Sequence, residues 1–192
     1  SGKLPMTFPV TLSDHRSSLN FPIDQKIDRR WSVKTGLTHK VKNVDYTLYD
    51  EGIYVGYRWF DTQKLQVSYP FGYGLSYSDF AYEKIESVKQ DKKNIRVTVS
   101  VKNTSGRDGE EVVQLYASYP DSKVERPSKQ LRAFKRIPIK AGESREVTLT
   151  VPKEELGYWN EEKQMFVVEP GTVKLLIGAS SEDIRLEGKV KL

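Results

Sequence analysis

The chain contains no cysteine among its 192 residues. That absence excludes disulfide bonds and metal sites built on thiolates. Histidine is almost as scarce, and the two that occur, His15 and His39, lie 24 positions apart, a spacing unlike that of paired metal ligands. The sequence therefore predicts no metal site. It also contains no Ser-His-Asp or Cys-His set that would indicate nucleophilic catalysis.

Long apolar runs are missing as well, because no stretch approaches the ~20 apolar residues of a membrane-spanning helix. Basic charge is not concentrated: residues 1–78 hold 10 Lys and Arg against 7 Asp and Glu, and residues 79–192 hold 21 against 19. Nucleic-acid-binding proteins gather such charge on one face, so the net charge of +5 does not indicate a nucleic-acid partner. Gly72-Tyr73-Gly74 lacks the third glycine and the following helix of a dinucleotide-binding loop, and we expect no cofactor.

Aromatic residues are abundant and unevenly placed, since eight of the 11 tyrosines lie between Tyr46 and Tyr82. Over residues 53–60 the apolar and aromatic side chains alternate, which predicts a strand covered on both faces. We expect a turn at residues 61–64 and a return strand at residues 65–69.

Residues 70–78, which we call the linker, place Pro70, Gly72 and Gly74 between aromatic residues. A flexible linker would be rich in Gly and Ser without large rings. The composition therefore predicts a linker held by packing. We expect it to lie along the C-terminal half of the chain, with Phe71, Tyr73 and Leu75 as the main contacts.

From residue 79 onward, short alternating segments follow one another with turn residues about every 10 positions. Ile95, Val97, Val99 and Val101, for example, alternate with polar residues. Seven or eight such strands in 114 residues predict a β-sandwich. We expect Pro138 to end one strand, residues 152–156 to form a helical turn, and Trp159 to anchor the core or cover an edge. Residues 10–45 lack a period and predict a long loop with a short helical turn.

The run Asp50 to Asp61, followed by Tyr69 to Tyr77, closely resembles the junction found in glycoside hydrolase family 3, the β-glucosidase and β-xylosidase family. Weaker marks of the same family are carried by segments elsewhere in the chain, namely 1–9, 113–116, 168–171 and 178–181. The resemblance implies that residues 1–78 end an α/β sandwich domain and that residues 79–192 form a fibronectin type III-like domain. The expected fold is mainly β: an immunoglobulin-like sandwich preceded by an extended, strand-containing remnant.

The resemblance also implies a function for the parent protein, hydrolysis of terminal β-linked sugars with retention. In the family both catalytic carboxylates lie upstream of the segments matched here, so we assign no catalytic residue and expect the isolated chain to be inactive. The implied partners are the upstream catalytic domains and a β-linked oligosaccharide or glucoside. An extracytoplasmic location is expected on the same ground.

Four residues are candidates for substrate binding. Glu51 and Arg58 have the charge to hydrogen-bond sugar hydroxyls, but the same residues would serve to fix the chain against a domain boundary. Trp59 and Tyr73 have rings that stack on the apolar C–H faces of pyranoses, but core packing uses such rings equally well. The sequence leaves both roles open for each residue.

Two other functions fit the sequence. One is a stand-alone β-sandwich module that binds a glycan or a protein partner, and the other is a structural spacer. A reading frame that continues several hundred residues upstream favours the enzyme, whereas a frame that starts near Ser1 with its own export signal favours the module.

Overall fold

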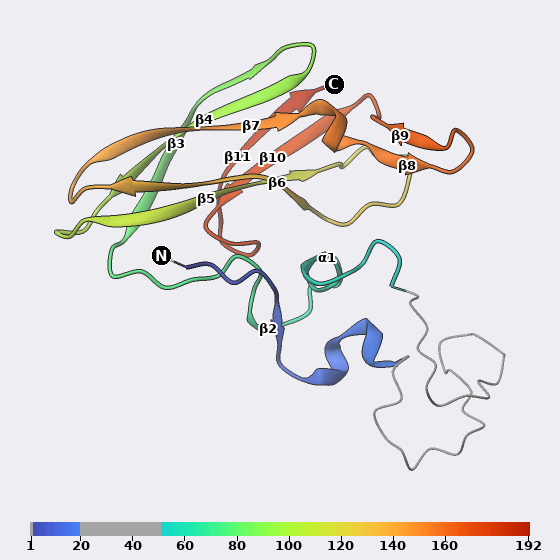
Figure 1. Ribbon diagram of the computed structural model, residues 1–192, viewed down its shortest axis with the longest axis horizontal. Helices are drawn as coiled ribbons and strands as arrows, with labels where there is room; N and C mark the ends of the chain where they lie inside the picture. The colour runs from blue at the N-terminus through green and yellow to red at the C-terminus, as the bar shows by residue number, and fades with distance from the viewer. Residues whose placement is uncertain (1, 20–50) are drawn as a thin grey trace.

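The computed structural model describes residues 2–19 and 51–192. Its main body is a sandwich of two antiparallel sheets (Figure 1). The four-stranded sheet has the order β11-β10-β5-β6, and the three-stranded sheet has the order β3-β4-β7. These strands are β3 (Phe80–Gln90), β4 (Asn94–Asn103), β5 (Gly109–Ser118), β6 (Gln130–Ile139), β7 (Ser144–Pro152), β10 (Thr172–Gly178) and β11 (Ile184–Lys191).

The core of the sandwich is built from the period-two pattern of the sequence. Successive side chains of a strand point to opposite faces, so every second residue of the central strands enters the space between the sheets. The innermost side chains are completely buried and belong to strands of both sheets: Ile95, Val97, Val99, Val101, Val113, Leu115, Val151, Leu175 and Ile177. The predicted mainly β sandwich is confirmed.

Two details of the sandwich differ from the sequence-based expectation. Pro138 does not end a strand, because β6 continues to Ile139. β6 is the edge of its sheet, where a residue without an N–H group is tolerated. Trp159 does not anchor the core, because it is 49% exposed. It lies on a separate hairpin of β8 (Tyr158–Asn160) and β9 (Met165–Val167). The predicted helical turn is confirmed as η3 (Lys153–Leu156).

The N-terminal segment consists of short elements on one side of the sandwich (Figure 1). β1 (Phe8–Pro9) pairs with β2 (Val67–Tyr69), which confirms part of the predicted return strand. Two 3-10 turns, η1 (Leu12–Asp14) and η2 (Arg16–Leu19), follow β1. The rest of the predicted loop, residues 20–45, lies outside the described residues.

The predicted strand over residues 53–60 is wrong, because α1 (Tyr57–Gln63) is helical. Gly56, at φ 60° and ψ −135°, turns the chain through a conformation open mainly to glycine. In a helix, residues three and four apart lie on the same side. Tyr57 and Asp61, four apart, face the sandwich, and Phe60 is buried against His15. The expected turn at residues 61–64 is the end of this helix, where Lys64 adopts φ 54°.

Candidate functional site

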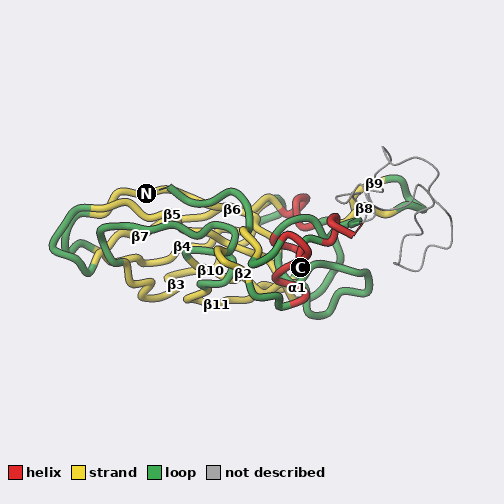
Figure 2. The backbone as a smooth tube through the Cα atoms, turned by 90° about the horizontal axis from the view of Figure 1, so that it is seen from below, coloured by secondary structure: helices red, strands yellow, loops and turns green. Residues whose placement is uncertain are grey.

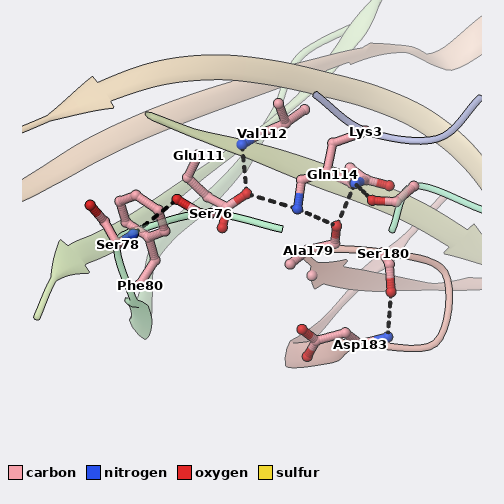
Figure 3. A network of polar contacts seen from close by, with 12 residues as sticks. Lys3, Ser76, Ser78, Phe80, Glu111, Val112, Gln114, Ala179, Ser180 and Asp183 are labelled. Carbon is pink, nitrogen blue, oxygen red and sulfur yellow. Dashed lines mark hydrogen bonds and ion pairs between the residues drawn. The ribbon is translucent and has the colours of Figure 1, made fainter. Parts of the chain in front are cut away.

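The linker crosses the outer face of the four-stranded sheet, and the contacts it makes there form the candidate site, which we call the seam. At its centre is Gln114 of β5, whose side chain is almost fully buried. Gln114 Nε2 donates to the carbonyl oxygens of Gly72 at 3.2 Å and Ala179 at 2.6 Å. Its Oε1 accepts from the Tyr116 hydroxyl at 2.5 Å. One side chain therefore joins the linker, β5 and the end of β10 (Figure 3).

A buried ion pair lies next to Gln114. Lys3 Nζ is 3.2 Å from Glu111 Oε1, with side-chain exposures of only 13% and 7%. Lys3 also donates to the Ala179 carbonyl at 3.1 Å, and Glu111 accepts from the Val112 N–H at 2.7 Å. Because each charge has its partner and further hydrogen bonds, the desolvation cost of burying it is offset. The pair ties the start of the chain to β5 (Figure 3).

The backbone of the linker is hydrogen-bonded on both sides. Leu4 donates its N–H to the Tyr73 carbonyl and accepts from the Gly72 N–H, both at 2.8 Å. On the other side, the Ser181 N–H donates to the Phe71 carbonyl at 2.9 Å. Gly72 has φ +80°, and a Cβ atom there would lie 2.2 Å from Gln114 Oε1. The prediction that the linker is held by packing is confirmed for residues 70–74, whereas residues 75–77 are exposed.

Of the three predicted main contacts, only Phe71 reaches the sandwich, through its own carbonyl and through Tyr57 of α1. The Phe71 ring stacks on Tyr57 at 4.5 Å between centroids, and the Tyr57 hydroxyl accepts from the Leu131 N–H at 2.8 Å. Tyr73 packs on Tyr69 at 5.2 Å, within the N-terminal segment. The prediction for Leu75 is wrong, because its side chain is 79% exposed. The contact comes instead from α1, an element the sequence did not predict.

A second buried charge pair fixes α1 to the sandwich. Lys129 Nζ lies 3.3 Å from Asp61 Oδ2, and the Ser181 hydroxyl donates to Asp61 Oδ1 at 3.3 Å. The Asp61 side chain is only 3% exposed. Burial raises the pKa of Asp61, although Lys129 and Ser181 act in the opposite direction. Burial raises the pKa of Glu182, and electrostatic repulsion from the Asp61 carboxylate raises it further.

A cleft of about 470 Å³ opens beside the linker, lined by residues from the linker, β3, β5 and the β10–β11 loop. Four of its charged groups form two ion pairs, Lys3 with Glu111 and Arg185 with Asp183. Arg185 donates to the Asp183 carboxylate, and Ser180 accepts from the Asp183 N–H. Within residues 2–19 and 51–192, no group of three or more His, Asp and Glu is arranged to hold a metal ion. The cleft thus carries structural ion pairs around the seam.

The four candidate substrate-binding residues fall into two places. Arg16 brings Glu51 and Trp59 together: it donates to the Glu51 carbonyl at 3.4 Å and lies 5.5 Å from the centre of the Trp59 ring. Trp59 Nε1 donates to the Asp14 carbonyl at 3.1 Å. Arg58, the residue before Trp59 on α1, is half-buried, and its Nε is buried without a hydrogen-bond partner.

Tyr73 is separate from these three residues. It lines the cleft beside the linker, together with Lys3 and Glu111. The structure therefore assembles Glu51, Arg58 and Trp59 around α1 but does not bring Tyr73 to them.

Sequence reasoning missed the main seam residues, Gln114 and Lys3. One signal was present: residues 112–117 read Val-Val-Gln-Leu-Tyr-Ala without a charge. A strand with no charged residue on either face is covered on both sides. In the structure Tyr116, on the outer face, is as fully buried as Leu115 on the inner face. The sequence predicted that the linker lies against the C-terminal half of the chain, but nothing in it indicated that α1 contributes to this cover.

Comparison with known proteins agrees with the architecture. Residues 111–181 match the family model of the fibronectin type III-like domain. The whole chain superposes on part of the β-glucosidase of Kluyveromyces marxianus with a TM-score of 0.84, 34% identity and 21% of that chain covered. It superposes likewise on β-glucosidase 3B of Thermotoga neapolitana, with a TM-score of 0.83, 38% identity and 24% of that chain covered. The sandwich is thus a fibronectin type III-like domain.

Sequence relatives of the chain are several times longer than the chain itself. Thermostable β-glucosidase B of Acetivibrio thermocellus is 39% identical over an alignment of 195 positions, which covers all of this chain and 23% of that protein. The exo-α-(1→6)-L-arabinopyranosidase of Bifidobacterium longum is 35% identical over 184 residues, 96% of this chain and 22% of that protein. The chain corresponds to the C-terminal part of glycoside hydrolase family 3 β-glucosidases, and it spans about a quarter of their length or less.

Proposed function

We propose that this chain is the structural C-terminal part of a retaining β-glucosidase-type hydrolase that acts on terminal β-linked sugars. The observation that carries the proposal is the extent of the match. All 192 residues align with β-glucosidases at up to 39% identity, yet they cover only 23% of such a relative. In this proposal the reaction takes place in upstream domains, and this part supports them.

The surface of the N-terminal segment supports the proposal. Apolar residues exposed on a soluble domain in such density indicate an interaction surface. Nine of the 13 exposed large apolar residues found in the described part of the chain lie in this segment: Met6, Phe8, Val10, Leu12, Ile53, Val55, Tyr69, Leu75 and Tyr77. We infer that the upstream domains of the same parent chain cover them.

The division of labour within the chain follows from this inference. We propose that residues 1–78 complete an α/β sandwich domain and that residues 79–192 fold as a separate unit. The described sandwich strands run from Phe80 to Lys191 and enclose one apolar core. In this proposal the contacts of Gln114, Lys3 and α1 fix the orientation of the separate unit relative to the catalytic domain.

The choice of sugar lies elsewhere in this proposal, and no catalytic residue is assigned to the chain. A relative named as an arabinopyranosidase and one named as a β-glucosidase match the chain almost equally, at 35% and 39% identity. Glu51, Arg58, Trp59 and Tyr73 stay candidates for contacts with the substrate in this proposal. On the ground of the family resemblance alone, we also propose an extracytoplasmic location for the parent. Among the described residues, no helix is long and apolar enough to cross a membrane.

A direct test compares two proteins in a chromogenic β-glucoside assay. The 192-residue chain should show no turnover, and the product of the full parent reading frame should hydrolyse the substrate. If the parent is inactive on a panel of β-linked glycosides, the proposed function is wrong. If the reading frame that encodes this chain has no coding region upstream, the assignment to an enzyme is also wrong.

A further inference from the structure

The β8–β9 hairpin carries a pair of exposed aromatic rings. Trp159 and Phe166 are direct cross-strand partners, and their rings meet edge to face at 5.3 Å and 73°. Trp159 is 49% exposed and Phe166 is 65% exposed. In both views the hairpin projects beyond the strands of the sandwich, at the end where α1 lies (Figures 1 and 2).

The base of the hairpin is fixed to the sandwich by Arg126. The Arg126 side chain is 6% exposed and pairs with Glu169 at 3.2 Å. Its guanidinium lies 5.3 Å from the ring centre of Tyr158, the residue before Trp159, and donates to the Leu156 carbonyl at 3.0 Å. Because these contacts hold the strand that carries Trp159, the exposed rings are oriented before any ligand arrives. Such preorganisation lowers the entropic cost of binding.

The size of the aromatic surface indicates the kind of ligand. An exposed half of a Trp side chain and two-thirds of a Phe side chain offer roughly 250 Å² together, taking about 200 to 250 Å² for each full side chain. A stable protein interface buries about 800 Å² on each partner. The two rings alone therefore offer too little area to hold a second protein. Two rings of this size match one or two sugar residues, whose C–H faces are flat and apolar.

The surroundings of the hairpin connect it to the candidate substrate-binding residues. Glu125, next to Arg126, hydrogen-bonds the Tyr54 hydroxyl and raises the pKa of that tyrosine. The Tyr54 ring in turn packs on Trp59 at 6.4 Å between centroids. A continuous set of contacts thus runs from the hairpin base to α1, and both lie toward the same end of the molecule.

We propose that Trp159 and Phe166 form an ancillary binding surface for a β-linked glucan chain. The proposal rests on the proposed function, because a hydrolase acting on chain ends gains from a second contact with the polymer. Binding at the hairpin would raise the local concentration of substrate without contributing to bond cleavage.

The test titrates the 192-residue chain with cellohexaose and with laminarihexaose, followed by isothermal calorimetry. We expect saturable binding of at least one oligosaccharide, and at least a tenfold loss of affinity in Trp159→Ala and in Phe166→Ala. Trp159→Tyr should keep most of the affinity. Phe134→Ala is the matched control, because Phe134 is 67% exposed on β6, and it should bind like the unchanged chain. Circular dichroism confirms that each variant is folded.

Three outcomes would overturn the inference: no binding by the unchanged chain, equal binding by the Trp159 and Phe134 variants, or self-association in sedimentation that depends on Trp159. The last outcome would identify the hairpin as a contact between copies. Failure here is distinguishable from failure of the proposed function, because the parent carrying Trp159→Ala should hydrolyse a small chromogenic glucoside at the unchanged rate. If the unchanged parent does not hydrolyse it, the proposed function itself is wrong.

Discussion

Replacing Gln114 with Leu tests whether the seam is held by a single buried hub. The substitution keeps the approximate volume but removes an acceptor and two donated hydrogen bonds. The Ala179 carbonyl keeps Lys3 as a donor, whereas the Gly72 carbonyl and the Tyr116 hydroxyl lose the partners described here. An unsatisfied buried polar group costs about 1–3 kcal/mol. Two such groups predict a loss of about 2–6 kcal/mol in the free energy of unfolding.

The assay is urea denaturation of the 192-residue chain, followed by circular dichroism. Gln90→Leu is the control, because Gln90 also donates to a carbonyl, that of Lys191, but from an exposed position. It should change the free energy of unfolding by less than about 0.5 kcal/mol. If Gln114→Leu and Gln90→Leu change the free energy of unfolding equally, Gln114 does not hold the seam together as reasoned here.

A double-mutant cycle sharpens the argument. Tyr116→Phe in the otherwise unchanged chain removes a satisfied hydroxyl and should cost about 1 kcal/mol. In the Gln114→Leu background the same change removes an unsatisfied hydroxyl, so it should cost nothing or restore stability. If Tyr116→Phe has the same effect in both backgrounds, the 2.5 Å hydrogen bond between these side chains does not contribute as reasoned here.

Three other predictions concern the seam and the division of the chain. Gly72→Ala should destabilise more than Gly142→Ala, because both residues have positive φ but only at Gly72 would the added Cβ meet another atom, 2.2 Å away; equal melting temperatures of the two variants would contradict this. Burial raises the pKa of Asp61 in the folded chain. Between the ordinary pKa of about 3.9 and this raised pKa, the folded chain therefore keeps a proton on Asp61 that the unfolded chain releases. The contribution of Asp61 to stability is thus complete below that window and is lost as pH rises through it, so Asp61→Asn should flatten the melting temperature against pH over this range, and an unchanged slope would count against the assignment. Limited proteolysis should cut first within residues 10–45 and leave 79–192 intact, whereas early cuts between residues 97 and 177 would show that the sandwich is not an autonomous unit.

The sandwich was predictable because its signal is local. A strand with one solvent-exposed face alternates apolar and polar residues along the sequence. β4 does so, with Ile95, Val97, Val99 and Val101 as its buried residues. Turn residues between such strands then indicate the fold class without knowledge of which strands pair. The end of β6 was misjudged because the tolerance for Pro138 depends on its place at a sheet edge.

The seam was not predictable for the opposite reason. Gln114 bonds residues 42 and 65 positions away in the chain, and no local pattern encodes such distances. Residues 53–60 carry apolar side chains that satisfy a period of two and also spacings of three and four. The backbone conformation at Gly56 favours the helix, and the presence of a glycine in the sequence does not predict that conformation. The family resemblance supplied the junction but not its contacts.

The measurement that tests the central claim most directly is the β-glucosidase activity of the purified 192-residue chain beside that of its full-length parent. The account predicts hydrolysis of a chromogenic β-glucoside by the parent and none by the 192-residue chain, since no catalytic residue is assigned to it. Turnover by the 192-residue chain that is lost on Glu51→Gln would contradict the account, because it would place the reaction within these residues.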